Sequence, residues 1–217
     1  SNNHPALQVF NVVENQMTGT IPESFGNLAN LEILYAGMNN FTGTIPESLG
    51  NLPALEFLHL NDNQITGSLP DSLSGAEKLK EINISKNILS GTLPENYSML
   101  LDLEFLDLSS NSELEGTLPE SWKSLTKLQK LFLHENQFTG SIPSSWSSLT
   151  QLNEISLANN QLTGSLPSSW SSLVNLWTLT LQNNFFSGSL PSSWSSLVNL
   201  KNMILSKNEL IGVLPDS

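Results

Sequence analysis

Cysteine and arginine are both missing from this sequence, and histidine occurs only at positions 4, 59 and 134. Because protein zinc sites take cysteine and histidine at short spacings, the three scattered histidines predict no metal site and no cofactor. Without cysteine, no disulfide forms within these residues. Disulfides elsewhere in a longer protein are compatible with this composition, so the missing cysteines leave the compartment open.

Basic residues are scarce. Eight lysines face 20 acidic residues, and the formal net charge is −12. Residues 1–108 hold 13 acidic residues against 3 lysines, a net charge of −10, while residues 109–217 hold 7 against 5, a net charge of −2. Such a surface argues against nucleic acid and against anionic membranes as partners. The common role of such a surplus of acidic side chains is to keep a protein soluble.

Long apolar runs are also absent. No stretch approaches the roughly 18 apolar residues of a membrane-spanning helix, so we expect no membrane insertion by this segment. Residues 1–6 are polar and are followed at once by a repeating pattern, so no secretory signal peptide is visible.

What the sequence has instead is a period, seen most clearly from Leu176 to Asn199. There Leu176, Leu179 and Leu181 are followed by Asn184, and the pattern L-x-x-L-x-L-x-x-N begins again 24 residues later. Nine copies, numbered one to nine, start at residues 7, 31, 55, 79, 103, 128, 152, 176 and 200. The single longer step carries an extra residue within 111–114, which we place in a turn.

Each copy predicts a short strand that is stable only when stacked on its neighbours. Leu179 and Leu181 alternate with Thr178 and Thr180, so the leucines face a core and the threonines face outward. Neighbouring copies then pair in a parallel sheet. The asparagine that ends each strand can both donate to and accept from backbone groups at the turn. We therefore expect residues 1–217 to form one repeat domain.

This pattern, with its continuation T/S-G-x-I/L-P, resembles the plant-type subclass of leucine-rich repeat proteins. The resemblance implies an α/β right-handed solenoid, with a curved parallel β-sheet on its concave face and short extended segments and 3-10 turns on its convex face. Plant ectodomains of this type usually carry cysteine-paired caps, so we expect the terminal caps to be missing here. The W-S-S-L copies within 116–200 also resemble trypanosomatid surface antigen repeats. Receptor, inhibitor and surface antigen all remain open.

Aromatic residues gather at outward-facing strand positions of copies two to six. The predicted partner-binding residues are Ile33, Tyr35, Phe57, His59, Glu81, Phe105, Asp107, Phe132 and Glu154. Contiguous apolar groups facing solvent mark contact surfaces, and aromatic residues are common anchors of interfaces. We expect a protein or peptide partner there, and the acidic neighbours favour a basic one. The alternative interpretation is that these aromatic residues are exposed as scattered side chains, as on most proteins, and form no binding surface. Trp177 is a second, weaker candidate for a contact residue.

Catalysis is not indicated. His59 lies two strands from Asp107, roughly 10 Å away, which is too far for a hydrogen-bonded pair. His134 lies closer to Glu135 and Glu154, but no activated nucleophile accompanies it, and we expect His4 to lie in a frayed end. We expect no enzyme.

Two other functions stay open. Near-identical late copies fit a structural surface antigen or stalk without a specific pocket. Hydroxyl columns flanking the glycines fit an ice- or water-ordering array, although Glu115 and Ile211 interrupt them. The columns are Thr18-x-Thr20, Thr42-x-Thr44, Thr66-x-Ser68, Ser90-x-Thr92, Thr139-x-Ser141 and Thr163-x-Ser165.

Two further features bear on structure and location. The column Tyr97, Trp122, Trp146, Trp170 and Trp194 predicts stacked aromatic core residues on the convex side, each indole needing a hydrogen-bond acceptor; an exposed ladder for sugars is the alternative.

Sequons at Asn40, Asn83 and Asn96 are candidate glycosylation sites, with Asn96 favoured because it lies on the convex side. We expect an extracellular or cell-surface location, with the cytoplasm not excluded.

Overall fold

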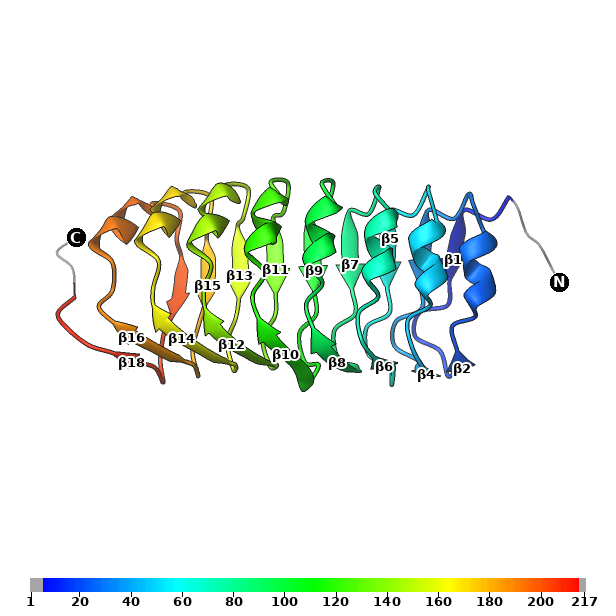
Figure 1. Cartoon of the computed structure of the whole chain (residues 1–217), viewed down its shortest axis with the longest axis horizontal. Helices are drawn as coiled ribbons and strands as arrows, with labels where there is room; N and C mark the ends of the chain where they lie inside the picture. Colours follow the sequence, from blue (N-terminus) through cyan, green and yellow to red (C-terminus); the bar gives the residue numbers. More distant parts are fainter. Residues whose placement is uncertain (1–5, 215–217) are drawn as a thin grey trace.

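The structure is a computed structural model that describes residues 6–214. His4 therefore lies outside the described residues. The chain winds as a solenoid in which one turn corresponds to one sequence copy (Figure 1). Each complete turn holds a strand of a first sheet, a strand on a second side and a short 3-10 helix. The predicted leucine-rich-repeat architecture is confirmed.

The first sheet holds the outward-facing residues. Its nine strands are parallel and follow chain order, from β1 to β17 through the odd-numbered strands. They are β1 (Val9–Asn11), β3 (Ile33–Tyr35), β5 (Phe57–His59), β7 (Glu81–Asn83), β9 (Phe105–Asp107), β11 (Lys130–Phe132), β13 (Glu154–Ser156), β15 (Thr178–Thr180) and β17 (Asn202–Ile204). Equivalent residues of neighbouring copies pair, as Tyr35 does with His59. One copy's side-chain column therefore continues into the next.

The second side of the solenoid carries shorter parallel pairings. A seven-stranded sheet runs from β18 to β6 through the even-numbered strands, and β2 pairs separately with β4. The strands are β2 (Thr18–Thr20), β4 (Asn40–Thr42), β6 (Thr66–Gly67), β8 (Ile88–Thr92), β10 (Glu113–Thr117), β12 (Gln137–Ser141), β14 (Gln161–Ser165), β16 (Phe185–Gly188) and β18 (Glu209–Leu210). Gly43 has a φ of +77°, and a Cβ there would lie 2.7 Å from the Thr20 methyl, so this position strongly favours glycine.

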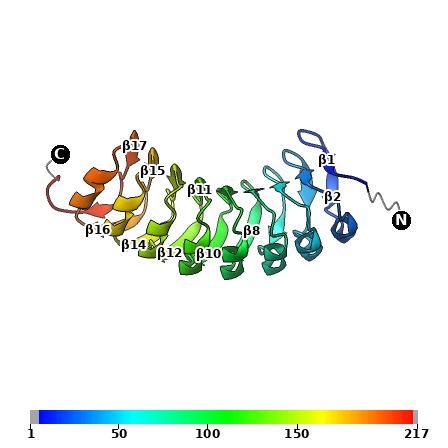
Figure 2. The same ribbon diagram turned by 90° about the horizontal axis from the view of Figure 1, so that it is seen from above.

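The 3-10 helices lie opposite the first sheet, and Figure 2 shows the first sheet along the inner side of the arc. Each helix starts directly after a proline, whose fixed φ ends the extended segment. They are η1 (Glu23–Asn27), η2 (Glu47–Asn51), η3 (Asp71–Gly75), η4 (Glu95–Met99), η5 (Glu120–Ser124), η6 (Ser144–Ser148), η7 (Ser168–Ser172) and η8 (Ser192–Ser196).

The asparagine column joins neighbouring copies through buried hydrogen bonds. Asn111, which is fully buried, donates from Nδ2 to the carbonyls of Ile84 and Leu108, at 3.1 Å in each case. Its Oδ1 accepts from the Leu89 N–H at 3.1 Å. One side chain thus satisfies backbone groups of two copies where the chain leaves the first sheet.

The tryptophan column is part of the core, as its structural interpretation predicts. Trp122, Trp146 and Trp170 are at most 1% exposed. Their rings stack at 6.3 and 6.5 Å between centroids. Each indole donates to the carbonyl of the proline that precedes the 3-10 helix of the previous copy, as Trp122 does to Pro94 at 2.9 Å. Burial excludes the alternative of an exposed aromatic ladder.

The extra residue of copy five lies in a turn, as predicted. Leu114 donates its N–H to the Asn111 carbonyl at 2.9 Å, which closes the turn around Ser112 and Glu113. In other copies the residue at the position of Leu114 donates to the next asparagine side chain. Here the N–H of Asn111 itself donates to Asn136 Oδ1 at 3.1 Å. The insertion therefore changes the donor and keeps the ladder connected.

Candidate binding surface

The predicted outward-facing residues do share one face. In each inner strand of the first sheet the middle residue is buried and the two flanking residues are half-buried on the concave side. The shared concave face is therefore confirmed. The predicted exposure is wrong in degree, because Ile33, Tyr35, Phe57, Phe105 and Phe132 all pack partly against their neighbours.

The aromatic zone also divides into two clusters. The first cluster comprises Tyr35, Phe57 and His59 in copies two and three. The Tyr35 and His59 rings stack with 4.4 Å between centroids and 17° between planes. Lys80 lies 6.0 Å from the Phe57 ring centroid, a cation–π arrangement. This end of the concave face is ordered by contacts within the protein.

The second cluster comprises Phe105, Phe132 and His134 in copies five and six. Phe105 and Phe132 meet edge to face, with 5.8 Å between centroids and 83° between planes. Phe132 and His134 also meet edge to face, at 6.3 Å. The two clusters are separated by strand β7 of copy four, which presents Glu81 and Asn83. The prediction of one contiguous aromatic zone is therefore wrong, because copy four carries polar residues in both outward columns.

His59 is joined to this polar strand. Its Nε2 lies 3.0 Å from Oε2 of Glu81. Burial lowers the pKa of His59 below its ordinary value, and the charge and hydrogen bond of Glu81 act in the opposite direction. Burial and the Glu81 charge both raise the pKa of the stacked Tyr35 phenol. The imidazole is thus held by a ring on one side and a carboxylate on the other.

A hollow of about 340 Å³ lies between the two clusters. It is lined by His59, Glu81, Asn83, Glu104, Phe105, Gln129 and Lys130. Sequence reasoning missed Glu104, Gln129 and Lys130 as lining residues. Glu104 and Gln129 occupy the residue just before the strand, outside the two columns that alternation identifies, and the hydrogen bond from Gln129 Nε2 to Glu104 Oε2 at 3.0 Å links them.

The remaining acidic candidates are engaged locally. Lys130 Nζ pairs with Glu154 at 2.7 Å, and Asp107 Oδ1 accepts from the N–H of Ser109 at 3.0 Å. Asn83 lies between His59 and Asp107 in the strand register, so those two are not a catalytic pair. Near His134, Glu135 accepts from Ser110 Oγ at 2.7 Å and Glu154 pairs with Lys130, while the buried Nδ1 of His134 has no hydrogen-bond partner among the described residues.

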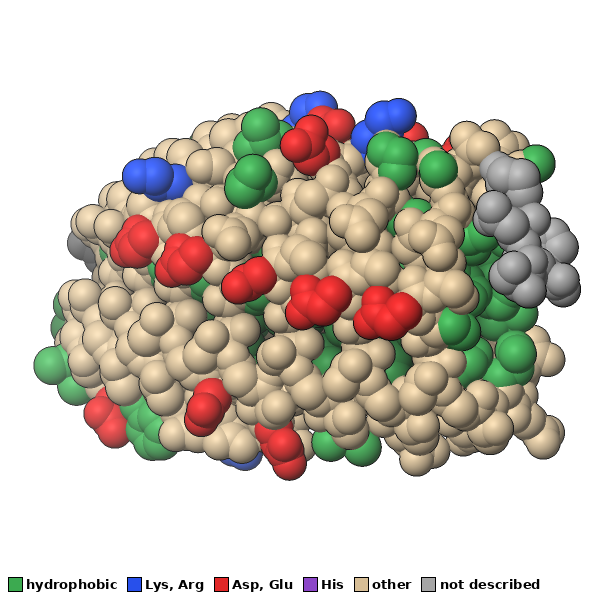
Figure 3. Space-filling view, turned by 45° about the vertical axis from the view of Figure 1, so that its right-hand side comes forward, with side chains coloured by type: hydrophobic (Ala, Val, Ile, Leu, Met, Phe, Trp, Pro, Cys, Tyr) green, Lys and Arg blue, Asp and Glu red, His purple; other side chains and the backbone are tan. Residues whose placement is uncertain are grey.

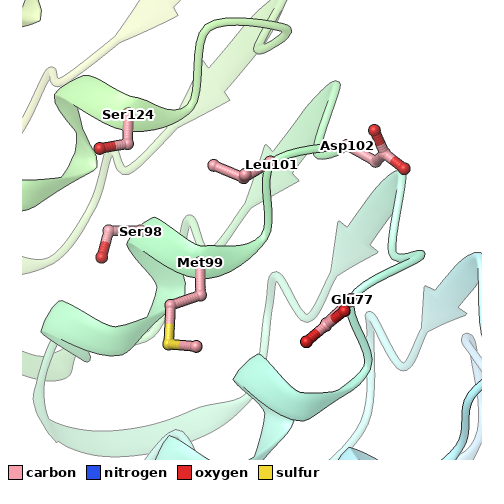
Figure 4. Close-up of a pocket in the computed structure, with 6 residues that line it drawn as sticks. All are labelled: Glu77, Ser98, Met99, Leu101, Asp102 and Ser124. Carbon is pink, nitrogen blue, oxygen red and sulfur yellow. The ribbon is translucent and has the colours of Figure 1, made fainter.

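A second hollow, of about 560 Å³, lies on the opposite side near η3, η4 and η5 (Figure 4). Its lining includes the exposed apolar side chains of Met99 and Leu101. Asp102 at its rim pairs with Lys127 at 2.6 Å, and this hydrogen bond lowers the pKa of Asp102. Figure 4 shows the side chains spread around the hollow without a common point of convergence. None of the predicted site residues lines it.

The convex side also carries a row of acidic side chains (Figure 3). One carboxylate stands at the first turn of each of the first five 3-10 helices: Glu23, Glu47, Asp71, Glu95 and Glu120. Serine takes this place in η6, η7 and η8. The charge asymmetry of the sequence thus becomes an acidic half of the solenoid.

The three sequons differ in how free their amides are. Asn40 begins β4 and Asn96 lies in η4, and both are exposed. Asn83 is half-buried on the concave face, and its Oδ1 accepts from Ser85 Oγ at 2.7 Å. The Asn40 and Asn96 side chains are therefore accessible, whereas the Asn83 amide is engaged within the protein.

No helix among residues 6–214 combines the length and apolar character that crossing a bilayer requires. The described part of the chain also gathers no group of three or more His, Cys, Asp or Glu side chains able to hold a metal ion.

Stacked parallel strands, an asparagine ladder and 3-10 turns define a leucine-rich-repeat solenoid. The chain belongs to this family and to its plant-type subclass. The family model described as "Leucine-rich repeat region" matches residues 5–182, and that described as "Leucine Rich Repeat" matches residues 175–197. A comparison with curated proteins finds no match.

Solved receptor ectodomains are similar to the chain. The ectodomain of the Arabidopsis thaliana receptor kinase GASSHO1/SCHENGEN3, in complex with CASPARIAN STRIP INTEGRITY FACTOR 2, has 37% identity and a TM-score of 0.92 over 94% of this chain. The Arabidopsis receptor kinase HAESA, in complex with the peptide hormone IDA and the co-receptor SERK1, has 34% identity and a TM-score of 0.81 over 97% of this chain. The chain spans 24% and 39% of those two chains.

A further similar structure is a plant ice-binding protein. It has 26% identity and a TM-score of 0.74 over 95% of this chain, which covers 74% of that chain. One repeat architecture thus serves proteins with unlike ligands, so the ligand must be argued from the side chains.

Proposed function

We propose that this chain is a non-catalytic recognition module that binds a protein or peptide partner on the concave face of copies two to six. The main support for this proposal is the hollow between the two aromatic clusters, where Phe105 adjoins the carboxylates of Glu81 and Glu104. Two of the similar ectodomains are seen in complex with a named factor or a peptide hormone, which supports this class of partner.

The expected partner is basic. Lys80 and Lys130 are already paired, with Glu56 at 2.6 Å and with Glu154 at 2.7 Å. Among the residues lining the central hollow, Glu81 and Glu104 then leave a negative surface beside the Phe105 ring. A lysine or arginine side chain would place its stem on the ring and its charge on a carboxylate. The acidic surroundings would speed the encounter.

Rigidity favours such binding. The Tyr35 ring is held by that of His59 and the Phe105 ring by that of Phe132, so these rings lose little conformational freedom when a partner arrives. We place the protein outside the cell or at its surface, where the similar receptor ectodomains act, with Asn96 as the favoured glycan site.

The test is selection of peptides from a random display library by the 217-residue chain. The concave variant carries Phe57→Thr and Phe105→Thr, since Thr178 occupies the same column in copy eight. The control carries Glu47→Ser and Glu95→Ser on the convex side, where later copies carry serine. Enrichment by wild type and control but not by the concave variant supports the proposal. Equal enrichment by all three would reject the site.

A structural surface antigen or stalk is the alternative, and the near-identical copies six to eight favour it. Absence of any enriched ligand would support that alternative, since a stalk needs no pocket.

An ice- or water-ordering array is the second alternative, supported by the similar ice-binding protein. Against it, hydroxyls of the array are used internally. Thr66 Oγ1 donates to the Gly43 carbonyl at 3.1 Å, and Thr42 and Thr139 donate to the equivalent glycine carbonyls at 3.3 Å. A thermal-hysteresis assay separates this function from peptide recognition.

A further inference from the structure

One tryptophan differs from all the others. Trp177 is 41% exposed, whereas the four tryptophans of the convex column are at most 6% exposed. It lies directly before strand β15, where this inner strand of the first sheet begins. Its N–H donates to the Asn153 carbonyl at 2.9 Å, and its own carbonyl accepts from the Lys201 N–H at 2.9 Å. Asn153, Trp177 and Lys201 therefore form one column across copies seven, eight and nine.

A hollow of about 370 Å³ opens beside the indole. It is lined by Asn153, Asn175, Trp177, Asn199 and Lys201. None of these described lining residues carries a carboxylate, although the chain has a net charge of −12. The hollow is therefore unsuited to the basic partner expected at the other end of the solenoid.

The amides around the hollow present acceptors. Asn175 Nδ2 donates to the Thr150 carbonyl and Asn199 Nδ2 to the Val174 carbonyl, both at 2.8 Å, which fixes the two amides. The Oδ1 atom of Asn153 is buried and has no hydrogen-bond partner among the described residues. A buried acceptor without a donor is costly, so a turn of the Asn153 amide toward the hollow would let a ligand hydroxyl supply the missing hydrogen bond.

We propose that this hollow is a second binding site, and that it takes a pyranose ring of a saccharide. A sugar ring has a C–H face that packs on an aromatic ring and hydroxyls that both donate and accept, which matches an indole surrounded by amides. Lys201 Nζ lies 5.3 Å from the Trp177 ring centroid and supplies a donor to sugar oxygens. A cationic ligand would need a carboxylate, which the lining residues lack.

Tryptophan fluorescence reports on this site, because Trp177 is the single solvent-exposed tryptophan among the described residues. The probes are cellohexaose and chitohexaose, which are neutral, and hexagalacturonate, which is acidic. We expect at least one to shift the emission in a saturable way, with a Kd of about 1 mM or tighter. Lys201→Gln keeps a donor and removes the charge, so it should weaken the acidic probe more than the neutral probes.

Calorimetric titration of two variants completes the test. Copy six carries Gln129 at the position that Trp177 occupies in copy eight, so glutamine is compatible with the fold there. Trp177→Gln should weaken binding at least about ten-fold. Phe185→Gln removes an exposed aromatic residue that begins β16, as Gln161 begins β14 in the preceding copy, and should leave affinity unchanged. Absence of binding by every saccharide, equal affinity in Trp177→Gln, or equal loss in Phe185→Gln would each overturn the proposal.

Discussion

The imidazole of His59 lies flat against the phenol ring of Tyr35, with 4.4 Å between centroids and 17° between planes. The two residues are paired directly across β3 and β5, so the stack is a consequence of strand register. It covers one face of the imidazole while Glu81 holds its Nε2 at 3.0 Å. Titration of His59 is therefore tied to the geometry of the concave face.

His59 should make stability depend on pH. Burial lowers its pKa below 6.5, so the unfolded chain takes up the proton first as the pH falls. The stability contributed by neutral His59 is fully present above pH 6.5 and is lost as the pH falls through the folded-state pKa. NMR titration of the His59 ring should give a pKa below 6.5, and Glu81→Gln should lower it further. A value at or above 6.5 would show that burial is not the dominant cause.

Tyr97→Phe should stabilise the fold. The Tyr97 ring is fully buried and stacks on Trp122 at 6.4 Å, but its hydroxyl has no hydrogen-bond partner among the described residues. Removing this unpaired hydroxyl should raise the free energy of unfolding by about 1 kcal/mol, measured by urea denaturation. Tyr35→Phe, at a half-buried position of the concave face, serves as control. A loss of stability in Tyr97→Phe would mean that the hydroxyl is satisfied in solution.

Asn111→Ala should be strongly destabilising. The change removes the partner of the Leu89 N–H and of the Ile84 and Leu108 carbonyls, all at buried positions. We expect a loss of about 3 kcal/mol. Asn15→Ala, in the same column, breaks only exposed hydrogen bonds within copy one and should cost less than about 1 kcal/mol. Similar losses of stability in the two variants would contradict the claim that burial makes the asparagine hydrogen bonds important.

Met38→Asn should increase stability. Met38 has a φ of 55°, a left-handed conformation that asparagine tolerates better than methionine, and its side chain is 48% exposed. Copies seven and eight carry Asn159 and Asn183 at this position, with φ of 55° and 56°. We expect a gain of about 0.5 kcal/mol in urea denaturation. Met99→Asn, at an exposed position in η4, should give no gain, and a loss in Met38→Asn would argue against strain.

Much of the fold could be predicted because one period repeats in register. Leucine alternation identified the first sheet, the asparagine column identified the turn, and the tryptophan column identified stacked core residues. The left-handed residue before each asparagine was not predicted, because residues as different as Glu14, Lys86 and Ser110 occupy it. That conformation is imposed by the turn and is not visible in side-chain type.

The site could be predicted only in part. Alternation identified which side chains face outward, but not how far neighbours bury one another. Copy four separates the aromatic clusters through Glu81 and Asn83, and Glu104 reaches the hollow from a position before the strand. The partner of His59 was missed for a related reason. Glu81 lies diagonally across the strand pair, and the register aligns it with Phe57.

Calorimetric titration of a peptide selected by the wild-type chain is the most direct test of concave-face recognition. The Phe57→Thr, Phe105→Thr variant should bind at least about ten-fold more weakly than wild type, because both anchors are removed. The Glu47→Ser, Glu95→Ser variant should keep its affinity within about two-fold, since those carboxylates lie on the opposite side. Unchanged affinity in the concave variant would contradict the account.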